Sequence, residues 1–182
     1  MQAATSILRY YKFFRQRNAS TVLDYGAGKL RNALFLSGEG FDVFAADLPE
    51  QIERIKGEPA VGRLAGLIEA TQLERTRLNV DLVISNYVFN IIPDGREKQH
   101  YLKNTVRNLH RGGYLLVEVR CRQNLVPCGS NCTHYMKCSS CVKTYSHEEL
   151  DKLVIPYGFS HICHYYRHRT LAVVYQLAEN HD

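Results

Sequence analysis

Two glycines and an aspartate are spaced as in a nucleoside-binding turn. Gly26 and Gly28 follow a short apolar segment at residues 21–25, and Asp47 follows the next one, at residues 41–46. Glycines at such a turn let the backbone bend tightly and let a ligand approach the main chain, while the following helix offers free N–H groups. An acid about 20 residues further on, at the tip of the second strand, can accept hydrogen bonds from two ribose hydroxyls. The spacing therefore predicts a nucleoside site.

A second group that could do chemistry is a cluster of cysteines. Five of the six cysteines lie within residues 121–141, separated by x6, x3, x5 and x2. Four thiolates in such a range can close a tetrahedral zinc site. The predicted ligands are Cys128, Cys132, Cys138 and Cys141, with Cys121 or His134 as substitutes. Free thiols are the main alternative, whereas a C-x3-C-x2-C iron–sulfur site would need cysteine where Tyr135 stands.

The elements that must position these residues alternate between strand and helix. Apolar runs predict strands at 21–25, 41–46, 64–70, 81–85, 114–119, 161–168 and 171–177. Apolar spacing and caps predict helices at 6–17 with Ser6 as N-cap, at 32–38, 49–56 and 97–109, and after Ser146, which forms a capping box with Glu149. This order predicts the α/β class: a Rossmann-like, doubly wound, mostly parallel seven-stranded sheet with a terminal antiparallel β-hairpin and a Cys-rich insertion after the fifth strand.

Size and charge limit the class of protein. A chain of 182 residues is long enough for one domain with a real core, which excludes a disulfide-dependent miniprotein and a two-domain enzyme. No segment approaches the roughly 20 apolar residues of a membrane span, and residues 1–17 do not resemble a secretory signal, so a cytoplasmic location is expected. The net charge is +5, and residues 1–17 hold four basic side chains and no acid. This bias suits an anionic partner or a solvated face.

The motifs taken together resemble those of class I S-adenosylmethionine-dependent methyltransferases. The segments that carry the resemblance are TVLDYGAGKLRN with Asp47 downstream, DLVISNYVFNII, RGGYLLVEV and SHEELDKLVIPYGF. Leu30 replaces a third glycine that is often found in the first motif, a change that the family tolerates. A nicotinamide-dependent oxidoreductase fits less well, because its G-x-G-x-x-G pattern would need glycine at Arg31.

The resemblance implies a role for several residues. Asp24, Gly26 and Gly28 would cradle the methionine end of the cofactor, and Asp47 would hold its ribose. Leu48 would pack against the adenine, with Thr71 or Gln72 at the adenine edge. Asn86 would face the cofactor near the transferable methyl group, and Asn86 and Tyr87 are the candidates for orienting the acceptor. His134 and His147 are the candidates for a general base. The segment Ser85-Asn86-Tyr87-Val88 lacks the prolines of enzymes that methylate exocyclic amines of DNA bases.

The expected protein is a single methyltransferase domain over residues 1–182, with an N-terminal lid helix at 1–18 and a zinc-binding insertion at 121–143. Its acceptor is expected to be an anionic small molecule, because basic and aromatic residues such as Tyr10, Tyr11 and Phe14 would surround one mouth. Alternatives are an RNA or DNA methyltransferase, and a non-catalytic protein of the same fold whose zinc loop binds nucleic acid or protein. The sequence does not set the oligomeric state.

Overall fold

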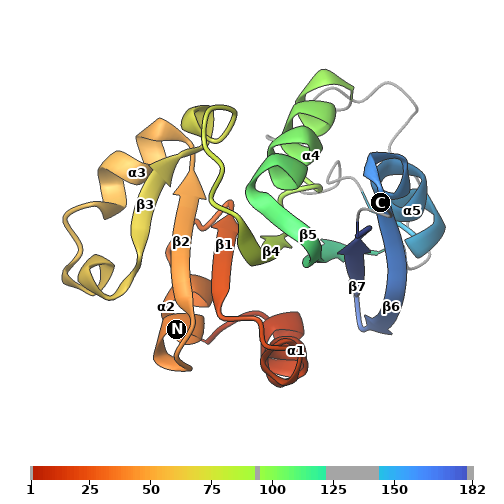
Figure 1. Ribbon diagram of the computed structural model, residues 1–182, viewed down its shortest axis with the longest axis horizontal. Helices are drawn as coiled ribbons and strands as arrows, with labels where there is room; N and C mark the ends of the chain where they lie inside the picture. The colour runs from red at the N-terminus through yellow and green to blue at the C-terminus, as the bar shows by residue number, and fades with distance from the viewer. Residues whose placement is uncertain (1, 93–94, 122–143, 180–182) are drawn as a thin grey trace.

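A single twisted sheet organises the molecule. The computed structural model describes residues 2–92, 95–121 and 144–179. Seven strands lie in the order β3-β2-β1-β4-β5-β7-β6 (Figure 1). The strands are β1 (Thr21–Tyr25), β2 (Asp42–Asp47), β3 (Gly66–Glu69), β4 (Val80–Asn86), β5 (Leu109–Arg120), β6 (Phe159–Arg167) and β7 (Thr170–Leu177). Strands β1 to β5 are parallel, and β7 pairs antiparallel with both β5 and β6. The predicted α/β class, with its mostly parallel seven-stranded sheet and terminal antiparallel hairpin, is confirmed, while the predicted Cys-rich insertion lies outside the described residues.

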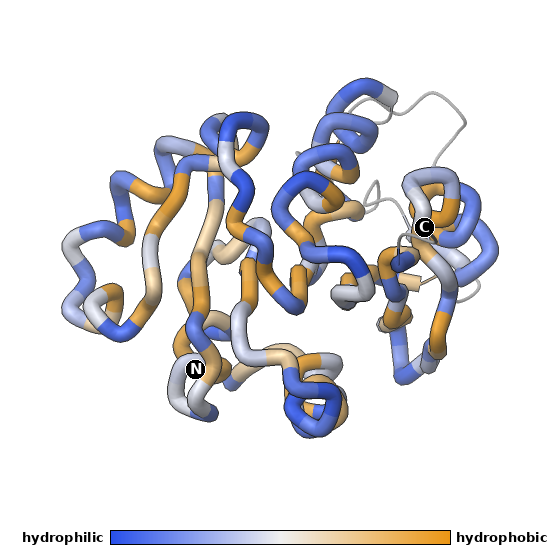
Figure 2. The backbone as a smooth tube through the Cα atoms, viewed as in Figure 1, coloured by the Kyte–Doolittle hydropathy of each residue, from blue (hydrophilic) through white to orange (hydrophobic). Residues whose placement is uncertain are grey.

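Helices cover both faces of the sheet, with α1 at the bottom of the view and α4 at the top (Figure 1). The helices are α1 (Thr5–Gln16), α2 (Arg31–Gly38), α3 (Pro49–Ile55), α4 (Arg96–Asn108) and α5 (His147–Val154), with short 3-10 turns η1 (Pro59–Arg63), η2 (Ala70–Gln72) and η4 (Ile155–Tyr157). Val22 belongs to the buried cluster that includes side chains of α1, α2 and α3, whereas its neighbour Leu23 belongs to the cluster that includes side chains of α4 and α5. Successive side chains of a strand point to opposite faces of the sheet, so the apolar strands contribute to one core on each face. The strands contain many of the apolar residues drawn orange in Figure 2.

Helix α1 begins differently from the sequence prediction. Ala4 is the N-cap, without a side-chain cap, and Ser6 lies buried inside the first turn. The free N–H groups of this turn instead reach across the fold: Ala4 N donates to Asn32 Oδ1 at 2.9 Å and Ser6 N donates to Glu118 Oε2 at 2.9 Å. The prediction of Ser6 as N-cap is wrong, because tertiary acceptors satisfy the backbone groups that a cap would bind.

The aromatic residues of α1 form core rather than a pocket mouth. Tyr10 and Phe14 are buried, and Phe14 packs against Tyr114 of β5 with ring centroids 5.5 Å apart. Tyr10 packs against Tyr165 of β6 at 5.8 Å. The expectation that Tyr10 and Phe14 surround an acceptor is therefore wrong, since both rings are used to bury the sheet face under α1.

Strand β5 starts five residues before the predicted strand. Helix α4 ends at Asn108, and Leu109 already pairs with Val80 of β4. A register shift between Val80 and Leu82 places Gly112, with φ +79°, and Gly113 within the strand. A Cβ on Gly113 would lie 2.9 Å from a backbone oxygen, so this glycine permits a close approach of backbone rather than ending the helix.

The C-terminal elements follow the prediction more closely. Ser146 caps α5: Glu149 N donates to Ser146 Oγ at 3.3 Å, and Ser146 N donates to Glu149 Oε2 at 2.9 Å, which confirms the capping box. Cys163 on β6 packs against the core under α1. The cysteine cluster beyond Cys121 lies outside the described residues. Among the described helices, none is long and apolar enough to cross a membrane.

Candidate active site

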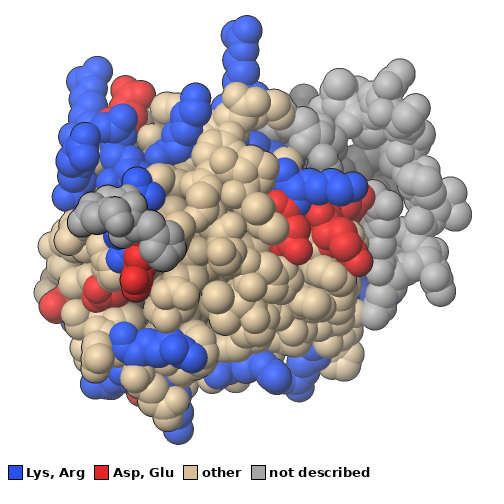
Figure 3. Space-filling model, turned by 45° about the vertical axis from the view of Figure 1, so that its right-hand side comes forward, with Lys and Arg blue, Asp and Glu red and all other residues tan. Residues whose placement is uncertain are grey.

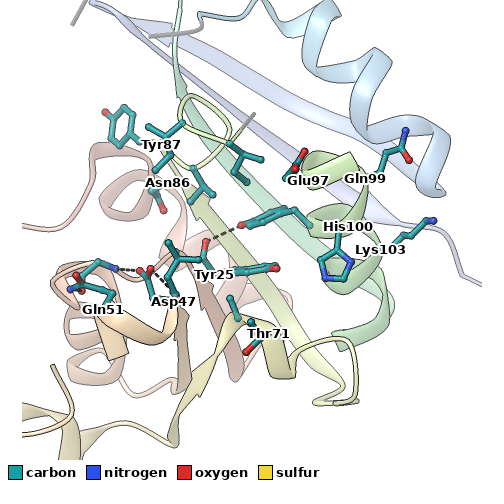
Figure 4. Close-up of a pocket in the computed structure, with 18 of the residues that line it drawn as sticks. Tyr25, Asp47, Gln51, Thr71, Asn86, Tyr87, Glu97, Gln99, His100 and Lys103 are labelled. Carbon is teal, nitrogen blue, oxygen red and sulfur yellow. Dashed lines mark hydrogen bonds between the residues drawn. The ribbon is translucent and has the colours of Figure 1, made fainter. Parts of the chain in front are cut away.

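A cavity of about 1020 Å³ opens at the carboxyl ends of β1, β2 and β4. Loops after these strands form one wall, and α4 forms the opposite wall (Figure 4). Of the residues expected to bind a cofactor or an acceptor, those that line the cavity are Gly26, Gly28, Asp47, Leu48, Thr71, Asn86 and Tyr87. The sequence motifs, which lie up to 61 positions apart, therefore converge on one side of the sheet, where ligands bind in open α/β folds.

The turn after β1 is closely packed. Gly26 has φ +96°, and its N–H donates to Ala46 O at 2.8 Å. A Cβ on Gly26 would lie 2.4 Å from Cγ2 of Val88, so only glycine fits between β1 and the loop after β4. Leu30, at the position of the third glycine of the family motif, has φ +61° and is buried. The backbone thus keeps the left-handed conformation that a glycine would adopt there.

Asp47 is held rigidly at the cavity wall. Its Oδ2 accepts from Gly28 N at 2.7 Å and its Oδ1 accepts from Leu48 N at 2.7 Å. Gln51 of α3 donates from Nε2 to Gly28 O at 2.7 Å, which ties the glycine turn to the end of β2 (Figure 4). The side chain of Leu48 is 60% exposed although it is apolar, and it offers an apolar contact surface at the rim of the cavity.

Asp24 lies beneath the glycine turn rather than in the cavity wall. It is 1% exposed, and neither carboxylate oxygen has a hydrogen-bond partner within the described part of the chain. Burial raises its pKa to about 7, and the negative charge of Asp47 adds to this, while the backbone N–H of Ala33 and the charge of Arg31 act in the opposite direction. The Ala33 N–H is close enough to lower the pKa without forming a hydrogen bond. Asp24, predicted to hold the methionine end of the cofactor, is thus a buried carboxyl group whose negative charge is only partly balanced by its surroundings.

Asn86 is the last residue of β4 and lies beside the first turn of α1, and Tyr87 follows directly after the strand. Asn86 Nδ2 donates to Ser6 Oγ at 3.0 Å, and Asn86 Oδ1 is buried with no partner among the described residues. Tyr87 has φ +62°, and its N–H donates to Glu118 O at 2.7 Å. Its hydroxyl lies 3.4 Å from Thr170 Oγ1. Burial raises the pKa of Tyr87, and its interaction with the Glu118 carboxylate raises it further. Both side chains are held by partners outside the cavity.

Helix α4 supplies a wall that the sequence motifs did not indicate. Tyr101 stacks on Tyr25 with ring centroids 3.8 Å apart and donates from its hydroxyl to Tyr25 O at 2.8 Å (Figure 4). The polar residues of α4 that line the cavity are Arg96, Glu97, Gln99, His100 and Lys103. The helical spacing of these residues with the buried Tyr101 was the available signal, because residues three and four apart share a face.

The remaining predicted site residues are His147 and a group that the structure does not describe. Cys128, Cys132, Cys138, Cys141 and His134 lie outside the described residues. His147 begins α5, where its ring stacks on His164 at 4.0 Å, and it does not line the cavity. Within residues 2–92, 95–121 and 144–179, no group of three or more His, Cys, Asp or Glu is arranged to hold a metal ion.

Comparison with known proteins assigns the chain to a family. A family model described as a methyltransferase domain matches residues 2–178, nearly the whole chain. The chain belongs to this methyltransferase family. The class I S-adenosylmethionine-dependent methyltransferase indicated by the sequence motifs is thereby confirmed, and the chain is an enzyme of that class. No curated protein sequence matches the chain.

Solved structures share the fold of this methyltransferase at low sequence identity. The 1,6-didemethyltoxoflavin-N1-methyltransferase of Burkholderia thailandensis, solved with its substrate and S-adenosylhomocysteine, has a TM-score of 0.71 and 16% identity over 96% of this chain and 79% of its own. A SAM-dependent methyltransferase of Methanosarcina mazei gives 0.69 and 15%, over 99% and 100% of the two chains. Human N-acetylserotonin methyltransferase with SAM gives 0.74 and 17%, over 95% and 51%. These likenesses confirm the architecture of the methyltransferase.

Proposed function

We propose that the cavity binds S-adenosylmethionine and that its methyl group is transferred to a small-molecule acceptor. The observation that carries this proposal is the placement of Asp47. Its carboxylate is fixed at the tip of β2 by two backbone N–H groups, each at 2.7 Å. A carboxylate has about four acceptor positions, so two remain for vicinal ribose hydroxyls. A fixed acceptor of this kind beside a glycine turn suits an adenosine group.

The other residues of the turn support the same ligand orientation. The exposed side chain of Leu48 and the position of Thr71 would bracket the adenine ring. Gly26 and Gly28 would let the methionine end approach the main chain. We propose that Asp24 acts through the turn above it, because a buried carboxylate creates a negative potential where the cationic ammonium and sulfonium groups would lie. Asn86 would lie near the methyl group.

The chemistry requires positioning more than proton transfer. When bound, S-adenosylmethionine supplies an electrophilic methyl carbon on a sulfonium, and in-line attack by the acceptor leaves a neutral thioether. The amide of Asn86, held in place by its hydrogen bond to Ser6, would shape the wall against which the acceptor lies. Tyr87, held by Glu118 and Thr170, would shape the same wall. A base is needed only if the acceptor keeps its proton, and the imidazole found among the described residues that line the cavity is that of His100 on α4.

The cavity wall bears on the class of acceptor. We infer a small acceptor with an apolar body, because Ile91 and Ile92 line the cavity together with Tyr25. The structural neighbours that act on 1,6-didemethyltoxoflavin and N-acetylserotonin support a small molecule. The cationic side chains of Arg96 and Lys103 favour an anionic group on the acceptor, as the sequence predicted. A nucleic-acid acceptor and a non-catalytic role remain weaker alternatives, since no feature of this cavity favours them.

The predicted zinc site stays part of the proposal. The ligands are Cys128, Cys132, Cys138 and Cys141, and the support is their spacing in the sequence. We propose that zinc closes the segment at 121–143 beside the end of β5, where it would border the acceptor side. The lid role of residues 1–18 and a cytoplasmic location likewise stay predictions.

Calorimetric titration with S-adenosylhomocysteine tests the cofactor proposal. We expect micromolar binding to the wild type and a loss of about tenfold or more in Asp47→Asn, because the amide offers the ribose one fewer acceptor oxygen, worth on the order of 1–3 kcal/mol. Asp42→Asn, at the exposed start of the same strand, is the matched control and should bind as the wild type does. Equal affinity of all three proteins would contradict the placement of the ribose.

A further inference from the structure

A second hollow lies at the opposite end of α4 from the glycine turn. It encloses about 520 Å³ and is formed by the segment before β4, the last turns of α4, the start of β5 and η4. Its lining residues include Arg77, Lys103, Arg107, His110, Arg111 and Tyr157, and among the described residues no Asp or Glu lines it. Lys103 is the one residue that lines both this hollow and the active cavity, so the two are neighbouring but separate sites.

Four cations of this basic hollow have no acidic partner among the residues that the structure describes. Within the described part of the chain, no Asp or Glu lies within ion-pair distance of Arg77, Lys103, Arg107 or Arg111. These four side chains come from three separate segments of the chain. All four side chains are exposed and line the same concave surface. Solvation alone does not require charged side chains to gather in this way.

Asp81, a half-buried acid that contacts His110 of this hollow, is already engaged. Asp81 Oδ1 lies 3.1 Å from His110 Nε2, while its Oδ2 accepts from the backbone N–H groups of Ser20 and Thr21, each at 2.8 Å. Although burial raises the pKa of Asp81, its hydrogen bonds to Ser20 and Thr21 outweigh burial and lower it, so the carboxylate stays charged. Glu179 is the other acid at this edge, and its carboxylate lies against Gly112.

The arrangement of charges favours an anionic ligand. Lys103 and Arg107 are four residues apart on α4, where like charges repel and destabilise a helix. Arg77 and Arg111 add two more positive charges from either side. Three of the four groups are guanidinium ions, whose planar fork matches the geometry of phosphate oxygens, and Lys103 adds a point charge. A bound phosphate would offset the mutual repulsion of the four groups.

We propose that this basic hollow is a phosphate-binding site of the protein, separate from the active cavity. On the face drawn in Figure 3, Lys and Arg side chains are spread over much of the surface, and Asp and Glu gather in fewer places, which suits attraction of a phosphate-bearing ligand. The source is either a phosphorylated small molecule or the backbone of a single-stranded nucleic acid. The proposal does not depend on methyl transfer.

Two probes distinguish these sources. Inorganic pyrophosphate is titrated by calorimetry, and a fluorescently labelled ten-nucleotide RNA is titrated by anisotropy, both at 50 mM salt. The test variant is Arg77→Gln/Arg107→Gln. The matched control is Arg54→Gln/Lys152→Gln, which removes the same charge at exposed positions on α3 and α5. Binding of S-adenosylhomocysteine and the melting temperature are measured on each variant to show that fold and cofactor site are intact.

We expect at least one probe to bind and the test variant to lose tenfold or more, while the control loses less than twofold. If RNA occupies four cationic contacts, its affinity should fall about 50-fold between 50 and 200 mM salt, and only about 7-fold in the test variant with two contacts left. Pyrophosphate binding alone identifies a small phosphorylated ligand, and RNA binding alone identifies a nucleic-acid backbone. Absence of binding by both probes, or equal losses in test and control variants, overturns the proposal even if S-adenosylhomocysteine binds.

Discussion

The buried carboxylate of Asp24 should make the stability of the protein depend on pH. Its pKa of about 7 in the fold, against 3.8 when unperturbed, means that the folded state holds the proton more tightly than the unfolded state. Stability is therefore lost as the pH rises from about 4 to about 7. At 1.36 kcal/mol per pH unit, the total loss is about 4 kcal/mol, of which roughly half falls between pH 5 and pH 8.

Asp24→Asn removes this dependence, because asparagine has nearly the same shape and no proton that titrates in this range. Urea unfolding at pH 5 and pH 8 measures the free energy of unfolding of wild type, Asp24→Asn and the exposed control Asp42→Asn. We expect the stability of Asp24→Asn relative to wild type to increase by about 2 kcal/mol between the two pH values, and Asp42→Asn to follow the wild type. A constant difference between Asp24→Asn and wild type would refute the burial argument.

Gly26→Ala should destabilise the protein by about 1–3 kcal/mol and abolish binding of S-adenosylhomocysteine, since its Cβ would lie 2.4 Å from Val88 Cγ2 at φ +96°. Adding Val88→Ala should recover only the steric part, and full recovery in thermal melts and titrations would show that the φ angle is unimportant. Ser146→Ala should cost about 1 kcal/mol in urea unfolding through loss of the cap on α5, and no loss would argue against that cap. Purified protein should contain about one zinc per chain, lost in Cys138→Ser/Cys141→Ser, and metal-free wild type by elemental analysis would eliminate the zinc site.

The sequence was most informative where one local pattern decides the structure. Strand β1 has the predicted bounds because its apolar run is bracketed by a polar segment and a glycine turn. The capping box at Ser146 was recognisable because its two hydrogen bonds join residues three positions apart. In contrast, Ser6 looked like a cap, but Glu118, which is 112 positions away, satisfies its N–H. The start of β5 was missed because pairing with β4 overrides the glycine pair as a helix stop.

The site was predictable on the side formed by strand ends. Gly26, Gly28 and Asp47 converge because the carboxyl ends of neighbouring parallel strands share one edge. The wall formed by α4 was not predicted, since it depends on how the helix rotates as Tyr101 stacks on Tyr25. The position of Asp24 behind the turn likewise depends on the side of the sheet that its side chain takes, which motif spacing does not give.

A crystal structure with S-adenosylhomocysteine bound tests the proposed cofactor site most directly. We predict the ribose hydroxyls within hydrogen-bond distance of the Asp47 carboxylate, the adenine beside Leu48 and Thr71, and the methionine end over Gly26. The sulfur should lie on the side of Asn86, with open cavity beyond it for an acceptor. A ligand bound elsewhere, or bound here with its ribose away from Asp47, would contradict the central claim.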